Sequence, residues 1–196
     1  MSMPILPISN VEVAEKKPLV RKLTWWVIVF PVVMFIALAT HNLYWLNFSH
    51  VISGVLWTGA DIFMGFMVGP ILRKLLPDQR KAFISWYVPK TMIYLPVLAF
   101  TTGTSGWMMA TWLQMMVPDA PDRIWIIGAL VIITILAVSG FGFLLPNAIR
   151  TYLELQKPQP NLEKVFRLNR RNNLFAGIQG IFQIAIILIM ARIVMG

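Results

Sequence analysis

Long apolar stretches separated by short polar connections dominate this chain. About 20 consecutive apolar residues are enough to cross the ~30 Å hydrocarbon core of a bilayer. Five such stretches follow one another, over residues 24–40, 43–72, 85–117, 124–146 and 174–196. The first is the shortest, the second and third exceed what one crossing requires, and none alternates like a strand. The pattern therefore predicts an all-α integral membrane helical bundle of about five transmembrane helices.

The segments outside these stretches differ in character. Residues 1–23 are rich in proline and show little periodicity, which predicts an extended tail before a single transmembrane domain over residues 24–196. Residues 150–173 mix leucines with charges, which predicts a cytoplasmic helical hairpin or a helix lying at the membrane surface. The first apolar stretch also resembles a cleavable signal peptide, and we interpret it as an uncleaved anchor helix.

Composition agrees with membrane insertion and excludes several classes of protein. Hydrophobic residues make up 58% of the chain and charged residues only 13%, too few for the surface of a soluble domain. The absence of cysteine excludes disulfides, thiolate metal sites and iron–sulfur clusters. The net charge of +9 lies in the connections rather than on one face, so we expect a lipid bilayer and no nucleic acid as partner.

Basic residues are distributed unequally between the two sides of the predicted bundle. Of the 17 Lys and Arg residues, all but Arg123 and Arg192 fall in the tail, in residues 73–90 or in residues 150–173. Because basic loops stay on the cytoplasmic side, this distribution places the N-terminus in the cytoplasm and the C-terminus outside. We expect a multi-pass protein of a prokaryotic cell (inner) membrane.

Polar side chains inside the apolar stretches are costly, and they usually face the bundle interior or a cavity. On the second stretch, His50, Trp57 and Asp61 share one helix face by their spacing. A stripe of the same spacing runs along the fifth, over Asn172, Ala176, Gln179 and Gln183. Asp61 lies about 16 Å beyond His50 along the helix, at 1.5 Å per residue. The sequence therefore predicts two polar layers, an outer one with His50 and an inner one with Asp61.

The outer layer is a candidate cofactor or metal site. Counting from the outer ends of the other stretches places three methionines at the level of His50 and an arginine just above: Met108, Met109, Met190 and Arg192. A b-type haem takes His and Met as axial ligands, with Arg near its propionates. A Cu(I) site combines Met sulfurs with His, and His41 would add a second imidazole. In the structural alternative, His50 bonds a backbone carbonyl among packing methionines.

The inner layer is a candidate for proton transfer. Asp61 is the only acidic residue in any predicted span, and counting from the inner ends places Tyr94, Ser139 and Gln183 around it. Its functional interpretation is proton transfer or the binding of a cationic group, so Asp61 is the candidate catalytic residue. The structural alternative is a neutral carboxyl bonded to Gln183 or Tyr94. The small residues of 101–106 predict a close-packing helix surface.

The segment Phe48-Ser-His-Val-Ile-Ser-Gly-Val-Leu-Trp-Thr-Gly59, followed by Gly69-Pro70 and Arg73, resembles the first helix of a prokaryotic membrane group. That group includes the copper-resistance protein D (CopD)-like proteins and the HemJ-type protoporphyrinogen oxidases. The shared pattern is His50, Trp57 and Gly59, and Thr102-Gly103 with Gly106-Trp107 resembles the group's next helix. The resemblance covers roughly residues 43–196. It implies that His50 is the haem-associated or metal-associated histidine, with Trp57 as a further residue of the cofactor site.

Three hypotheses follow from these patterns. The leading one is a membrane-embedded protein that binds b-type haem in electron transfer or redox chemistry, as an oxidoreductase or a subunit of one. The first alternative is a protein that transports or handles Cu(I) with His50, His41 and the outer methionines. The second is a non-catalytic structural subunit of a larger membrane complex. Partners in all three are the lipid bilayer and a second copy or other membrane subunits.

Overall fold

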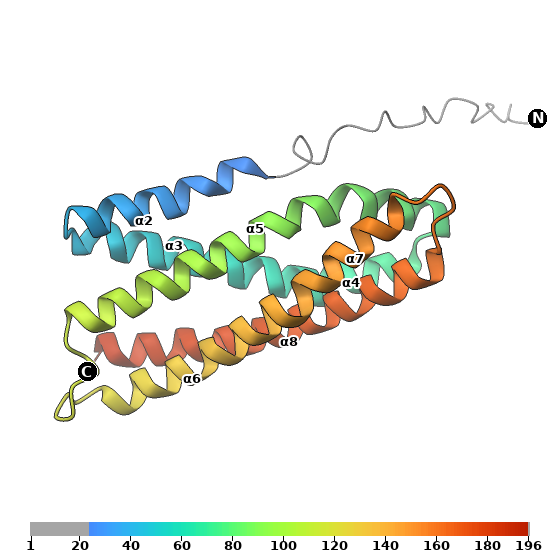
Figure 1. Ribbon diagram of the computed structural model, residues 1–196. Coiled ribbons are helices and arrows are strands. Elements are labelled where there is room, and N and C mark those ends of the chain that lie inside the picture. Colours follow the sequence, from blue (N-terminus) through green and yellow to red (C-terminus); the bar gives the residue numbers. More distant parts are fainter. Residues whose placement is uncertain (1–23, 196) are drawn as a thin grey trace, which may run out of the picture.

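The computed structural model describes residues 24–195, and helices make up nearly all of this part of the chain (Figure 1). The extended tail expected over residues 1–23 lies outside the described residues. The helices in chain order are the 3-10 helix η1 (Trp25–Ile28), α2 (Val29–Ala39), α3 (Leu43–Ile62), the π-helix η2 (Phe63–Val68), α4 (Gly69–Lys74), α5 (Pro77–Trp112), α6 (Arg123–Ser139), the π-helix η3 (Gly140–Leu144), α7 (Leu145–Leu155) and α8 (Leu162–Met195). The all-α prediction is confirmed.

Several of these helices join end to end into continuous rods. Four rods are long and apolar enough to cross a membrane: Leu43–Lys74, Pro77–Trp112, Arg123–Leu155 and Leu162–Ile193. The shorter apolar helix Trp25–Ala39 is the fifth, as the marginal first stretch predicts. At 1.5 Å per residue it reaches only about 22 Å, less than the ~30 Å core. The part of the chain that the structure describes is therefore a helical membrane bundle of four full-length rods and one short helix.

Successive rods run in opposite directions, so their connections alternate between two ends of the bundle (Figure 1). The turns that join α4 to α5 and α7 to α8 lie at one end, with the basic residues of the two segments. The α2–α3 turn, the α5–α6 loop and the end of α8 lie at the other. This arrangement agrees with the sides assigned from charge, and we call the two ends inner and outer accordingly.

Helix boundaries differ from the predicted spans mainly at the inner end. Helix α5 begins at Pro77 rather than near residue 85 and ends at Trp112 rather than 117. Helix α8 begins at Leu162 rather than near residue 174. Residues 150–173 are therefore the inner ends of α7 and α8 with their turn, which is the hairpin alternative and not a helix lying on the surface. Hydropathy misses these extensions because they leave the apolar core and carry charges.

The core is divided into three levels along the bundle axis. A central cluster joins Val27 of the short first helix with Trp57, Leu98 and Leu136, one from each of three rods. An outer cluster consists of Met34, Ala37 and Leu46, and an inner one of Ile84, Val88 and Val165. Large apolar side chains elsewhere remain exposed, as lipid-facing positions require: Phe35, Val131 and Leu188 are 55%, 54% and 66% exposed.

Helix α8 packs against the π-helix η2 through glycines. A Cβ atom placed on Gly65 would lie 2.2 Å from the Cα of Gly177, and one on Gly180 would lie 2.7 Å from Cγ1 of Ile62. Only the absence of side chains allows the two backbones to approach this closely. This contact fixes the register of α8 against α3, which sets the surroundings of Asp61.

Candidate functional site

His50 is held by α5. Its Nδ1 lies 2.9 Å from the carbonyl oxygen of Thr102 and 3.3 Å from Oγ of Ser105. A carbonyl oxygen only accepts hydrogen bonds, so Nδ1 carries the proton and Nε2 keeps its lone pair. The ring lies against Gly106, where a Cβ would come within 2.7 Å of Cε1 of the imidazole. Helix α5 thus fixes both the tautomer and the orientation of this half-buried side chain.

Hydroxyl groups extend this contact into a small network between α3 and α5. Thr102 Oγ1 donates to Ser53 Oγ at 2.9 Å, and Ser53 Oγ donates to the carbonyl of Ser49. Ser105 Oγ donates to the carbonyl of Thr101. The sequence predicts only a packing surface over residues 101–106, so the positioning of His50 by Thr102, Ser105 and Gly106 was missed. Their spacing along one face of α5 was the available signal.

The outer methionines lie further out than predicted. Met108 and Met109 pack with Trp112 around the outer cluster that contains Leu46, one turn before His50. The residues that contact His50 are instead Thr102, Ser105 and Gly106. The predicted layer was displaced by about one turn because α5 ends five residues earlier than the apolar stretch suggests.

The remaining residues of the predicted outer layer spread over the outer third of the bundle. His41, in the α2–α3 turn with φ 49°, stacks on Trp112 with ring centroids 5.0 Å apart. Met190 is half-buried on α8, and Arg192 is exposed on the last turn of that helix. Within the described part of the chain, no three or more His, Cys, Asp or Glu side chains gather into a metal site. His41 therefore lies with Trp112 near Met108 and Met109, at the outer end of α5. His50 lies apart from them, beside the hydroxyl groups of α5.

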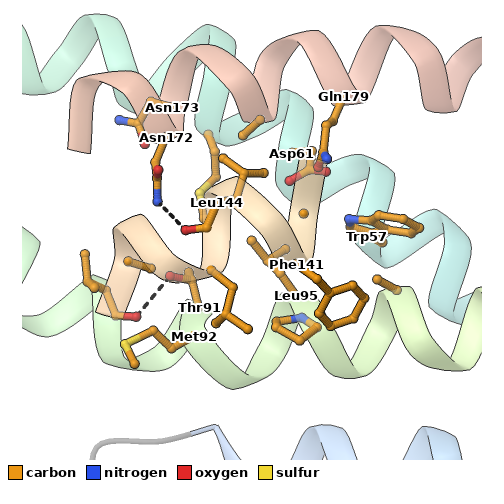
Figure 2. Close-up of a pocket in the computed structure, with 18 of the residues that line it drawn as sticks. Trp57, Asp61, Thr91, Met92, Leu95, Phe141, Leu144, Asn172, Asn173 and Gln179 are labelled. Atoms are coloured by element: carbon orange, nitrogen blue, oxygen red, sulfur yellow. Dashed lines mark hydrogen bonds between the residues drawn. The ribbon is translucent and has the colours of Figure 1, made fainter. Parts of the chain in front are cut away.

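Asp61 is fully buried in the inner half. Its Oδ2 accepts a hydrogen bond from Nε2 of Gln183 at 2.9 Å, so the predicted pairing of these two residues is confirmed. Among the described residues, no hydrogen bond reaches its Oδ1 or Oε1 of Gln183. Trp57, one turn earlier on the same face of α3, flanks the carboxyl (Figure 2). The inner polar layer therefore exists, but its hydrogen bonding is incomplete.

Two other predicted members of this layer have different partners. Tyr94 packs against Trp26, with ring centroids 5.8 Å apart, on the side of α5 that faces the first helix. Ser139 Oγ accepts a hydrogen bond from Gln179 rather than from Asp61. Counting residues along a helix gives the depth of a side chain and not the face from which it projects. On the cavity side, α5 contributes Tyr87, whose hydroxyl donates to Sδ of Met64.

Amide side chains of α8 support the π-helix η3. Gln179 Nε2 donates to the carbonyl of Leu136 at 3.0 Å, and Asn172 Nδ2 donates to the carbonyl of Leu144 at 3.0 Å (Figure 2). A π-helix disturbs the regular i to i−4 hydrogen bonding of the rod, and side chains from a neighbouring helix can supply the missing partners. The polar stripe of α8 therefore has a structural role along η3 in addition to its contact with Asp61.

A cavity lies between these elements (Figure 2). It contains about 700 Å³ of space free of atoms, its open mouth included, and is lined by residues of α3, η2, α5, α6, η3, α7 and α8. Its polar lining includes Asp61, Asn169, Asn172 and Gln179, while the rest is largely apolar. Both π-helices border it, at Met64 and at Phe141. Short π-helical segments inside α-helices are frequent at functional sites.

The sequence missed several residues of this cavity. Asn169 and Asn173, both buried on α8, lie beside the predicted stripe that begins at Asn172 and were not counted in it. Thr91 and Tyr87 of α5 carry no periodic signal of their own. Comparison of the chain with protein-family models, with curated proteins and with solved structures finds no match. The assignment of chemistry therefore rests on this chain's own residues.

Proposed function

We propose that this protein is a membrane-embedded redox protein that binds a b-type haem through Nε2 of His50. The observation that carries the proposal is the hydrogen bond between Nδ1 of His50 and the Thr102 carbonyl. Histidines that bind metals usually donate their other ring N–H to a carbonyl or carboxylate, which orients the ring and raises the basicity of the ligating nitrogen. His50 has this arrangement inside an apolar bundle.

Three features of His50 and its surroundings support the proposal that this one residue of the chain would hold the haem. The imidazole is half-buried, its proton is on the nitrogen that α5 holds, and Gly106 keeps the adjacent helix surface free of a side chain. The Met108 and Met109 side chains pack one turn further out, and Arg192 is exposed at the end of α8. The proposal therefore assigns ligation to His50 alone and positioning to Thr102 and Ser105.

A haem held there would supply one-electron transfer, while the chain's own residues would bind and orient it. Burial in an apolar bundle and hydrogen bonding of the axial histidine are two of the means by which proteins set haem potential. We further propose that the protein works in a prokaryotic inner membrane, as an oxidoreductase or a subunit of one, either as a homo-oligomer or with other subunits.

Absorbance spectroscopy of the purified protein tests this proposal. We expect a Soret band in the wild-type protein, its loss in His50→Ala, and its retention in His41→Ala, the other histidine of the chain. Thr102 acts through its backbone, so Thr102→Ala should keep the band, while Gly106→Ala should weaken it. A colourless wild-type protein purified from haem-supplemented cells, or an unchanged band in His50→Ala, would contradict the proposal.

A Cu(I)-handling role is the second candidate, and one observation favours it. His41 stacks on Trp112, and Met108 and Met109 pack with that tryptophan around Met34. Thioethers and imidazole are the ligands that Cu(I) prefers. Titration with Cu(I) against a competing chelator tests it: His41→Ala and Met109→Leu should each lower the affinity, and His50→Ala should not. A protein that binds neither haem nor copper would support the non-catalytic subunit.

A further inference from the structure

The cavity around Asp61 has a polar floor and an apolar rim. Its floor is formed by α3 and α8, where Asp61 is 0% and Gln179 3% exposed. Its rim is formed by α5 and by the α6–η3–α7 rod, most of whose lining residues are partly exposed; Phe141 is 46% exposed. Figure 2 shows Asp61 and Gln179 on the floor side and Leu95 and Phe141 on the rim side. The mouth therefore lies between α5 and η3.

The floor holds polar atoms that lack hydrogen bonds within the described residues. Asp61 Oδ1 and Asn172 Oδ1 are buried acceptors without partners, and Nδ2 of Asn169 is a buried donor without one. All three residues line the cavity. A buried polar group left unsatisfied costs about 1–3 kcal/mol, and native proteins rarely leave several together. A ligand that donates to the two oxygens would remove most of this cost.

The rim determines how such a ligand would enter. The exposed part of the rim is apolar and belongs to the middle of two membrane-spanning rods, so the mouth faces lipid rather than water. A water-soluble metabolite has no route through that opening. A lipid-soluble molecule can reach it from the bilayer and place a polar headgroup on the floor.

The chemistry of the floor and its neighbours selects a neutral donor over a cation. Lys and Arg side chains flank both turns at the inner end of the bundle, and these charges disfavour an ammonium headgroup. Two unpartnered acceptors beside one donor match a headgroup with hydroxyl groups. Flat rings would have Trp57 and Phe141 beside them.

We propose that this cavity is a binding site for a lipid-soluble dihydroxy-aromatic ligand of the quinol class. Its hydroxyl groups donate to Oδ1 of Asp61 and to Oδ1 of Asn172, and its tail leaves between α5 and η3 into the bilayer. The site lies about 16 Å along α3 from His50 and is separate from it. Binding at the cavity does not require a haem at His50, so each proposal stands or fails on its own measurement.

Isothermal titration of the full chain in lipid nanodiscs with a decyl benzoquinol tests the site. We expect saturable binding that is about tenfold or more weaker in Asp61→Leu, which removes the central acceptor while keeping a similar volume. The bis-methyl ether of the same quinol, which donates no hydrogen bond, should bind as weakly to the wild-type protein as the quinol binds to Asp61→Leu. Thr134→Ala, which removes an exposed hydroxyl of α6, is the matched control and should bind normally.

A second variant keeps the test decisive if Asp61→Leu does not fold. Ala137→Phe fills the cavity from the α6 wall without touching the polar floor, and it should abolish binding. Equal affinity of the quinol and its ether, normal binding to Ala137→Phe, or binding of decylammonium in place of the quinol would each overturn the proposal. The Soret band is read on the same samples: a colourless protein that binds the quinol contradicts only the His50 proposal.

Discussion

His50 and Asp61 belong to one helical rod, yet the outer and inner halves of the bundle treat them differently. In the outer half, α3 and α5 are regular helices, and the proton of His50 is bound by the Thr102 carbonyl with Ser105 alongside. In the inner half, the rods contain the π-helices η2 and η3, and no hydrogen bond from residues 24–195 reaches Oδ1 of Asp61. The proton of His50 thus has an acceptor, whereas Asp61 lies beside a cavity.

This difference shows that the polar residue does not by itself decide its surroundings. Each π-helix shifts the face that its rod presents to its neighbours. Both η2 and η3 contribute residues to the lining of the cavity beside Asp61. A fixed imidazole suits a resident group, whereas an open cavity with unsatisfied acceptors suits a ligand that enters and leaves.

The largest effect is expected from the contact that holds the inner half together. Gly65→Ala would place a Cβ 2.2 Å from the Cα of Gly177, against backbone that cannot rotate away. We expect unfolding free energy to fall by about 3 kcal/mol, measured by denaturation in detergent. Gly59→Ala, six residues earlier on the same rod and with nothing within 4 Å, is the control and should be neutral or slightly stabilising. Equal midpoints for the two variants would show that the α8–η2 contact is loose.

A smaller effect is expected in the outer half, from Gly106→Ala. Its Cβ would lie 2.7 Å from Cε1 of His50, but the imidazole can rotate at the expense of its bond to Thr102. We expect a loss of about 1–2 kcal/mol in stability together with a weakened Soret band. Gly103→Ala, on the same helix with nothing within 4 Å, should change neither. If both variants behave alike, α5 does not position the ring.

The hydrogen bond between Gln183 and Asp61 should contribute still less. Buried hydrogen bonds between membrane helices contribute about 0.6 kcal/mol on average and up to about 1.7 kcal/mol. We therefore expect Gln183→Leu to destabilise the protein by about 1 kcal/mol. A double-mutant cycle with Asp61→Leu measures the coupling, and the second substitution should cost less once the first is present. Strictly additive effects would mean that the 2.9 Å contact contributes nothing.

The smallest effect concerns the inner end of the bundle, where a second acidic side chain, unlike Asp61, has partners for both of its oxygens. Glu154 lies on α7 beyond the apolar part of its rod, and its Oε2 accepts from Lys164 and Lys157 at 2.9 Å. These contacts, that of Lys164 first, lower the pKa of Glu154 to about 2. A carboxyl with a lowered pKa stabilises the fold above its unfolded value, about 4.3, and this contribution disappears as pH falls toward 2.

Hydrogen exchange of residues 150–161 measures this contribution. After correction for intrinsic rates, protection of the α7–α8 turn should be constant above about pH 5 and fall between about pH 4 and pH 2. Glu154→Gln should show the lower protection at every pH. A pH-independent wild-type profile would contradict the assignment. A fall in protection that is confined to this turn would show that Glu154 stabilises the turn and not the whole inner half.

Much of the fold follows from the sequence, because the bilayer imposes it. Unpaired backbone groups are costly in hydrocarbon, so apolar stretches of this length must be helices, and basic residues must stay on one side. The sequence also placed Asp61 beside Gln183, since both lie on polar stripes at matching depth. It predicted a helical hairpin over residues 150–173, where the inner ends of α7 and α8 lie. It did not place the π-helices or the inner extension of α5.

The sequence by itself determined the all-α class, the position of the long apolar helices along the chain, and the level of His50 and Asp61 on their helix. Only the tertiary structure decided which side chains face them. The glycine contact between Gly65 and Gly177 sets the register of α8, and the outer end of α5 brings Thr102 rather than Met108 to His50. The depth of a side chain in the bilayer depends only on its own helix and on how that helix crosses the membrane. The neighbours of that side chain depend on how several helices are rotated and on how closely they approach one another. Small residues and π-helices change both without altering hydropathy.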